Sequence, residues 1–227
     1  MFNELAPVYD LGNHLLSLGL DFRWRKRLAK ELGKYQPESV LDLASGTADL
    51  AIAIKKRLPE ALTVGIDLAA KMLARAGRKI ARSGPGGSIA LALADVEDLP
   101  FADQSFSAAS IGFGVRNLEA RPRGLSEIFR VLRPGGVLAV LEFSMPEKGW
   151  FAGFYRIYLG MLLPWIGKIL SGKASYFYLR DTIAEFPSPA EFAAELEAAG
   201  FLVRQVVSLS RGAVWLYLAE KQVGVRP

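Results

Sequence analysis

Short apolar runs alternate with segments of helical periodicity over most of the chain. Each run is largely continuous in apolar residues and leads into a small or acidic residue. The runs occupy residues 39–43, 62–66, 88–94, 106–113 and 137–143. Runs of this kind are typical of parallel strands that are buried on both faces. We therefore expect them to form the parallel part of one sheet.

Helical spacing and capping signals mark the segments between the runs. Apolar residues follow Arg121 at the spacing of one helical face, and Pro-Gly-Gly at 134–136 stops that pattern. Residues 50–58 carry another helical pattern. Ser-Pro-Ala-Glu at 188–191 combines an N-cap, a first-turn proline and a capping-box acid, and Gly200 ends the helix that it begins.

The C-terminal part of the chain predicts an antiparallel closure of the sheet. Two further apolar-rich runs, 201–209 and 213–220, flank a short turn at 210–212. Because so short a connection joins antiparallel strands, the pair should close an otherwise parallel sheet. The predicted fold class is α/β: a doubly wound, mostly parallel seven-stranded sheet with an antiparallel C-terminal strand.

Composition favours one large domain and excludes several chemistries. The chain has 227 residues, of which 51% are hydrophobic, so extended disorder is excluded and a single core is expected. With no cysteine and one histidine, the chain has no disulfide framework, no thiolate nucleophile and no metal site of Cys or several His ligands. Ser-His catalysis could depend only on His14.

The chain is basic, with 28 Lys and Arg against 23 Asp and Glu and a net charge of +5. The basic residues cluster at Arg23, Arg25, Lys26 and Arg27 and again at Lys71, Arg75, Arg78, Lys79 and Arg82. Solvated helix faces explain such clusters, and attraction to an anionic lipid or substrate is the alternative. Nucleic acid is not expected as a partner, because Trp24 alone among the nearby residues could stack on a base.

Neither an export signal nor a membrane span is expected. Residues 1–20 carry acids and no basic leader, so the expected localisation is cytoplasmic. The longest apolar stretch, 150–170, contains charges, glycines and a proline, and is too interrupted for a spanning helix. Its aromatic residues are consistent with core packing, with a channel for an apolar substrate or with peripheral contact at the inner face of the membrane.

Polar residues follow the first strands at the points where a ligand would bind. Ligands of doubly wound sheets lie outside the carboxyl ends of the strands, where Gly46, Asp67, Asp95 and Gly114 all fall. Asp67, about 20 residues after Gly46, can accept hydrogen bonds from a ribose diol, and Asp95 would lie near an adenine. This pattern indicates an adenosyl-ligand pocket. The alternatives are a tight strand-to-helix turn and an ordinary strand-end acid.

Several motifs together carry a family resemblance. They are Asp-Leu-Ala-Ser-Gly-Thr-Ala-Asp at 42–49, Gly-Ile-Asp at 65–67, Leu-Pro-Phe at 99–101, Phe-Gly-Val-Arg-Asn at 113–117, Arg-Val-Leu-Arg-Pro-Gly-Gly at 130–136 and Leu-Glu-Phe-Ser at 141–144. The chain resembles the quinone-biosynthesis C-methyltransferases, the demethylmenaquinone and 2-methoxy-6-polyprenyl-1,4-benzoquinol methylases, from about residue 2 to residue 221. The motifs at 113–117 and 141–144 are the most specific. The resemblance implies a class I, S-adenosylmethionine-dependent enzyme.

The resemblance also implies the ligands and the residues that bind them. The cofactor is S-adenosyl-L-methionine, and no metal is expected. Its binding residues would be Gly46, Thr47, Asp49, Asp67, Asp95 and Val96. The substrate would be a polyprenyl hydroquinol, because a ring carbon is nucleophilic enough only in the electron-rich reduced form. A helical cap at about 1–37 and a substrate-recognition insertion at about 147–186 would complete a single domain, 1–227.

The catalytic candidates lie after the fourth strand and near the N-terminus. Arg116 and Asn117 could orient a quinol oxygen or a water molecule, although an ordinary Arg is too basic to deprotonate anything unaided. For Arg116 the alternative is a buried structural ion pair. Tyr9 and Asp10 are further candidates if the N-terminal segment covers the pocket, and the alternative for this pair is packing and capping.

Two residues depart from the family pattern. Ala48 stands where the family usually has Gly, and its methyl group would crowd a ligand or resist a positive φ. Gly112 stands where some members have a Ser.

The activity is expected to be C-methylation in the menaquinone or the ubiquinone pathway. The alternatives are a methyltransferase for another small aromatic or lipid and a non-catalytic accessory protein; a nicotinamide-dependent Rossmann protein is disfavoured by the missing glycines. A homodimer stays open.

Overall fold

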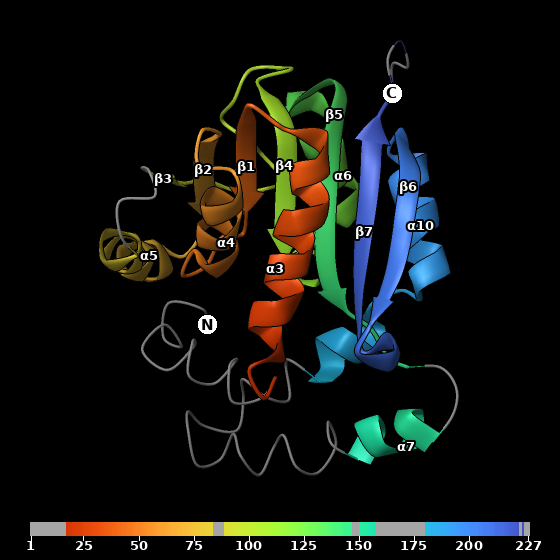
Figure 1. The fold of residues 1–227 in the computed structure, drawn as a ribbon. Coiled ribbons are helices and arrows are strands. Elements are labelled where there is room, and N and C mark those ends of the chain that lie inside the picture. Colours follow the sequence, from red (N-terminus) through yellow and green to blue (C-terminus); the bar gives the residue numbers. More distant parts are fainter. Residues whose placement is uncertain (1–16, 84–88, 147–149, 158–179, 223, 225–227) are drawn as a thin grey trace.

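The computed structural model describes residues 17–83, 89–146, 150–157, 180–222 and 224. These residues contain one seven-stranded sheet in the order β3-β2-β1-β4-β5-β7-β6 (Figure 1). The strands are β1 (Ser39–Leu43), β2 (Leu62–Asp67), β3 (Ile89–Leu93), β4 (Phe106–Gly112), β5 (Leu132–Phe143), β6 (Phe201–Leu209) and β7 (Val214–Lys221). β7 is antiparallel to both of its neighbours, and the other pairs are parallel. The predicted sheet, with its single antiparallel strand, is confirmed.

Helices cover both faces of the sheet, so the domain has three layers (Figure 1). The helices are α3 (Leu20–Leu32), α4 (Asp49–Arg57), α5 (Ala70–Arg82), α6 (Arg121–Val131), α7 (Trp150–Ile157) and α10 (Pro189–Ala198), with short 3-10 helices η1 (Gly33–Tyr35), η2 (Val115–Asn117) and η4 (Ser210–Gly212). α3 and α4 pack on one face, and α6 and α10 pack on the other. This is the doubly wound arrangement that the alternating pattern predicts.

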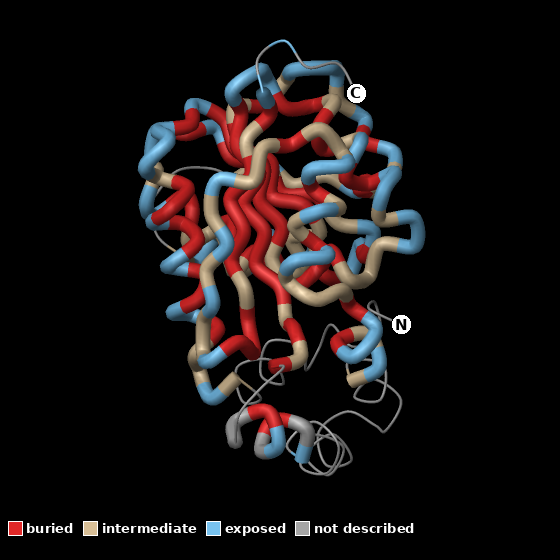
Figure 2. The backbone as a smooth tube through the Cα atoms, turned by 90° about the vertical axis from the view of Figure 1, so that its right-hand side faces the viewer, coloured by how far each residue is buried: buried red, intermediate tan, exposed pale blue. Residues whose placement is uncertain are grey.

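Side chains of the central strands alternate between the two faces. On β1, Val40 packs with Leu28 of α3, whereas Leu41 packs in the opposite core with Ile128 of α6. Figure 2 shows the central strands buried along most of their length. Burial on both faces explains why these strands are continuous apolar runs.

The strand β5 begins five residues earlier than the apolar pattern predicts, at Leu132 rather than at 137. Leu132 pairs with Phe106 of β4, and the register then shifts before Ala108 pairs with Val137. Pro-Gly-Gly at 134–136 therefore forms an irregularity inside the strand rather than a loop before it. The other predicted strand ends coincide with the observed ends or differ from them by one residue.

The helix α10 has the predicted capping box. The Ser188 backbone N–H donates to Glu191 Oε2 at 2.8 Å, and the Glu191 N–H donates to Ser188 Oγ at 3.4 Å. Phe192 and Leu196 are fully buried, and Gly200 follows the helix with a left-handed φ of +96°. These features match the N-cap, the apolar face and the C-terminal stop expected from the sequence.

The described part of the expected N-terminal cap consists mainly of α3, which packs along the sheet and is followed by η1. Trp24 of α3 is buried, and its indole N–H donates to Ser210 Oγ at 3.0 Å. Of the expected insertion at 147–186, the structure describes 150–157 and 180–186, so the two boundaries stay predictions. None of the helices in the described part of the chain has the length and hydrophobicity that a membrane crossing requires.

Candidate active site

The loop between β1 and α4 forms the centre of the site. Three of its residues, Ala44, Gly46 and Ala48, have left-handed φ values of 48°, 56° and 68°. These turns reverse the chain sharply at the carboxyl end of β1, next to the ends of β2 and β4. The site therefore lies at the edge of the sheet where the sequence predicts it.

Asp67, at the end of β2, connects this loop to the next helix. Its Oδ2 accepts the Gly46 backbone N–H at 2.8 Å, and its Oδ1 accepts the Ala69 N–H at 2.8 Å. Burial raises the pKa of this carboxyl, and the backbone donors oppose the rise. The carboxylate is thereby fixed at the boundary between two strand ends.

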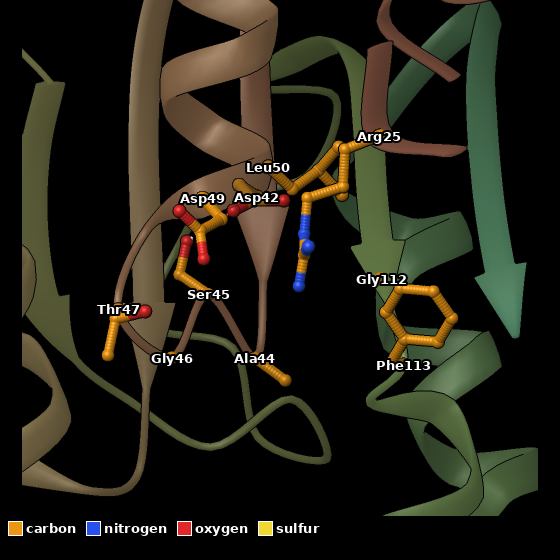
Figure 3. Close-up of a pocket in the computed structure, with 10 residues that line it drawn as sticks. All are labelled: Arg25, Asp42, Ala44, Ser45, Gly46, Thr47, Asp49, Leu50, Gly112 and Phe113. Atoms are coloured by element: carbon orange, nitrogen blue, oxygen red, sulfur yellow. Dashed lines mark hydrogen bonds between the residues drawn. The ribbon is translucent and has the colours of Figure 1, made fainter. Parts of the chain in front are cut away.

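Two hollows flank the loop, and they share Ala44, Gly46, Gly112 and Phe113 as lining residues. The larger, of about 690 Å³, extends toward β2 and β3 and is also lined by Asp67, Leu68, Met72, Ala94, Asp95, Val96, Gly114, Asn117 and Leu118. The smaller, of about 380 Å³, lies toward α3 and α4 (Figure 3) and is also lined by Arg25, Asp42, Ser45, Thr47, Asp49 and Leu50.

All six residues predicted to bind the cofactor line these hollows. Gly46 lines both, Asp95 and Val96 line the larger with Asp67, and Thr47 and Asp49 line the smaller. The sequence thus predicts residues from three strand ends that the fold brings to one place.

Lys79 of α5 holds two of these residues from outside the loop. Its Nζ lies 2.7 Å from Asp49 Oδ1 and donates to Thr47 Oγ1 at 3.3 Å. An ion pair from the neighbouring helix therefore fixes the start of α4. Asp95 accepts the Glu97 N–H at 2.9 Å and so also serves as a turn acid, the alternative foreseen for it.

Ala48 has the positive φ expected for a position that favours Gly, but its methyl group does not crowd the site. The residue is fully buried and packs with Ala51 and Ala76, and it lines neither hollow. The expected crowding of a ligand is wrong, because the left-handed turn directs the methyl group into the core between α4 and α5.

Gly112 lies where β4 reaches the loop, and it lines both hollows. A Cβ atom at this position would lie 2.9 Å from Leu50 Cδ2. A side chain such as Ser would therefore require Leu50 to move. Gly112 and Leu50 fit one another in this chain.

Arg116 is held in a buried ion pair. Its NH1 group lies 2.5 Å from Glu142 Oε1 and donates to the Phe113 carbonyl at 2.6 Å, and its guanidinium lies over the Phe143 ring. It lines neither hollow, so the geometry is that of the structural alternative, and the expected contact with a quinol oxygen stays a prediction. Its neighbour Asn117 does line the larger hollow. Tyr9, Asp10 and His14 lie outside the described residues.

Asp42 is a functional candidate that the sequence interpretation missed. The side chain is 1% exposed, and it accepts hydrogen bonds from the hydroxyls of Ser45 and Ser110, the latter at 2.6 Å. Burial raises its pKa to about 6, and the two hydroxyls and nearby Arg25 oppose the rise. The signal was an acid in the middle of an apolar run.

Arg25 is the second candidate that the sequence interpretation missed. It was grouped with the neighbouring basic residues of α3, and the cluster was interpreted as a solvated helix face. The residue is 9% exposed, pairs with Asp21 and places its guanidinium 5.5 Å from the centre of the Phe113 ring. It precedes Leu28 and Leu32 by three and seven positions, so helical spacing places it on the apolar face. That spacing was the signal available in the sequence.

The sheet order and the hollow at its carboxyl edge define the fold of the class I methyltransferases. A SAM-dependent methyltransferase from Thermotoga maritima has this fold, with a TM-score of 0.69 at 19% identity over 98% of this chain and 100% of that one. Among the described residues, no group of acidic or His side chains is arranged to hold a metal ion.

The family follows from the sequence match. Residues 1–221 match the ubiE/COQ5 methyltransferase family, and the chain belongs to it. The chain is 46% identical over 205 residues to the demethylmenaquinone methyltransferase of Thermus thermophilus, and the matched region covers 90% of this chain and 92% of that protein. It is 41% identical over 223 residues to the ubiquinone/menaquinone biosynthesis C-methyltransferase UbiE of Geotalea daltonii, covering 97% and 94% of the two chains.

Proposed function

We propose that the protein transfers a methyl group from S-adenosylmethionine to a ring carbon of a polyprenyl hydroquinol. Membership of the family and the names of the relatives support this class of substrate. The single observation that best supports S-adenosylmethionine as the cofactor is the position of the Asp67 carboxylate, which two backbone N–H groups fix beside the larger hollow.

The residues around the hollows fit S-adenosylmethionine. Each Asp67 oxygen accepts one backbone N–H and retains a lone pair for a ribose hydroxyl. Asp95 and Val96 line the same hollow where the adenine would bind, and Thr47 and Asp49 line the other. When bound, the cofactor supplies an electrophilic methyl group on its sulfonium.

The protein's own contribution is positioning, because this transfer needs an aligned acceptor more than acid-base machinery. Asn117 lines the larger hollow and can orient a quinol hydroxyl through its amide. The Arg116–Glu142 ion pair holds the 3-10 helix that presents Asn117, so we assign Arg116 a positioning role. The cap at 1–37, with Tyr9, and the insertion at 147–186 would cover the acceptor.

We further propose that the protein contacts the membrane peripherally, on its cytoplasmic face, because a polyprenyl chain partitions into lipid. The helix α5 carries five basic residues and no acid, and Lys71, Arg78 and Arg82 are exposed on it. Basic segments of this kind are attracted to anionic headgroups by about 1 kcal/mol per residue near the surface.

The test is methyl transfer from radiolabelled S-adenosylmethionine to two short-chain acceptors, a demethylmenaquinol and a demethylated benzoquinol, both kept reduced. Label in the ring of either acceptor supports the proposal and selects the pathway, and loss of labelling on oxidation supports the hydroquinol requirement. No labelling by a protein that still binds S-adenosylhomocysteine would favour another aromatic or lipid acceptor. A protein that does not bind S-adenosylhomocysteine would be an accessory protein.

A further inference from the structure

One of the two helix layers exposes basic side chains alone. On α3, α4 and α5, which the structure describes in full, no acid is exposed, because Asp21 and Glu31 are buried and Asp49 pairs with Lys79. These helices lie on the same face of the sheet, and we call their outer surface the basic layer. Its exposed charges are Arg23, Lys26, Arg27, Lys30, Lys56, Arg57, Lys71, Arg78 and Arg82.

The layer on the other face of the sheet is mainly acidic. The segment 181–198, which includes α10, contains no Lys or Arg, and α6 exposes one base, Arg123. The exposed acids of that segment are Asp181, Glu185, Glu191 and Glu197. Such a separation of charge orients a domain in the field of a charged surface. An anionic surface therefore attracts the basic layer and repels the opposite one.

Exposed leucines lie at the carboxyl edge of the sheet, next to the basic layer. Leu68 follows β2 and Leu93 ends the neighbouring strand β3, and they are 65% and 62% exposed. Leu18, which is 83% exposed, precedes α3. The start of α3 lies at this edge too, because Trp24 packs against Phe113 at the end of β4 (Figure 1). Exposed apolar side chains gathered beside basic helices are typical of a membrane-contacting surface.

An anionic bilayer is the partner that fits both features. Its headgroups attract Lys and Arg, and its interfacial region accepts apolar side chains. A nucleic acid would neutralise the basic layer but would leave the leucines in water. The larger hollow supports the same choice, because Leu68 lines it and thereby connects the leucine edge with the candidate site.

We propose that the protein docks on an anionic bilayer through the basic layer and through Leu18, Leu68 and Leu93, with the acidic layer facing away from the lipid. The proposal rests on the proposed function, since it deepens the peripheral contact stated there. It extends the contact from α5 to α3 and α4, and it fixes the orientation of the domain. In this orientation the larger hollow opens at the membrane surface, so that a quinol ring can enter it while the prenyl chain stays in the lipid.

The test is sedimentation with vesicles of phosphatidylcholine and with vesicles that also contain phosphatidylglycerol, at low and high salt and without cofactor or quinol. The wild type should bind the anionic vesicles and be released by high salt, because salt screens the attraction. Charge reversal on α3, Lys26→Glu/Lys30→Glu, and on α5, Arg78→Glu/Arg82→Glu, should each weaken binding on the order of tenfold to a hundredfold. Circular dichroism checks that each variant is folded.

Arg123→Glu/Arg133→Glu is the matched control, because it lowers the net charge by the same amount outside the basic layer. This variant should bind as the wild type does. Leu93→Gln should weaken binding about tenfold, as expected for loss of one buried apolar side chain. Leu62 is 60% exposed at the start of β2, on the opposite edge of the sheet, so Leu62→Gln should have no effect.

Equal losses in the control reversal would show attraction by net charge alone and would overturn the proposal. Loss confined to the α5 reversal would also overturn it, because α3 would then lie outside the contact. A wild type that does not bind anionic vesicles would overturn it and favour an acidic protein as the partner of the basic layer. Methyl transfer to short-chain acceptors without vesicles tests the proposed function separately: labelling without vesicle binding removes the docking surface alone, and oriented vesicle binding without labelling removes the quinol activity alone.

Discussion

Asp42 is an acid inside the core, and its replacement by Asn should change how stability depends on pH. Burial raises its pKa from 3.8 to about 6, because the loss of water disfavours the charge more than Ser45, Ser110 and Arg25 favour it. The unfolded chain therefore releases this proton near pH 3.8, and the folded protein releases it near pH 6. Between these values the folded state binds more protons.

The sign of the effect follows from this difference in proton binding. The contribution of Asp42 to the free energy of unfolding falls as the pH rises from about 4 to about 6, and it stays low above pH 6. A shift of about two pKa units corresponds to about 3 kcal/mol at 1.36 kcal/mol per unit. This is a sizeable part of the stability of an ordinary domain.

Asp42→Asn removes the titration and keeps one oxygen acceptor and one amide donor for the two serine hydroxyls. The variant should be more stable than the wild type at pH 7 by up to about 3 kcal/mol, and the difference should vanish near pH 4. Urea denaturation followed by circular dichroism from pH 4 to pH 8 measures this difference. A variant less stable than the wild type at pH 7, or a difference that does not vary with pH, would refute the reasoning.

Three further predictions concern the loop and the ion pair. Asp67→Ala should keep the fold and weaken S-adenosylhomocysteine binding by about 1.5–3 kcal/mol for each lost ribose hydrogen bond, as measured by calorimetry. Ala48→Gly should leave that affinity within about twofold, because the methyl group packs in the core; a tenfold gain would show crowding after all. Arg116→Met should destabilise the protein by about 3–5 kcal/mol, by leaving Glu142 buried and unpaired. Adding Glu142→Leu should restore the melting temperature, and full recovery of methyl transfer in that double variant would reject a catalytic role for Arg116.

The strands were predictable because strands that are buried consist largely of apolar residues, and this is visible in the sequence of each strand. β1 and β6 have the bounds that the apolar runs indicate, and α10 has its capping box, since local signals determine these elements. The early start of β5 was not predictable in this way. Leu132 becomes a strand residue because Phe106 of another strand pairs with it, and no local pattern contains that partner.

The cofactor residues were predictable from their place at strand ends, because the topology brings all carboxyl ends to one edge. Arg25 was missed because its charge was taken to indicate a solvated helix face, and Asp42 was missed because it was considered only as part of the motif at 42–49. Helical spacing places Arg25 with the apolar residues of α3, and β1 is buried at every position. A charge at a position that the periodicity marks as buried deserves a functional hypothesis.

The order of strands in the sheet also sets an order of events during synthesis. β6 precedes β7 in the chain, yet β7 lies between β6 and β5. The ribosome therefore produces β6 before β7, its one neighbour among the described strands, and β6 cannot pair with β7 until translation has passed Lys221. Pairing β5 with β7 also closes a loop of about 70 residues. We therefore expect the first five strands to assemble early and the C-terminal hairpin of β6 and β7 to dock on β5 last.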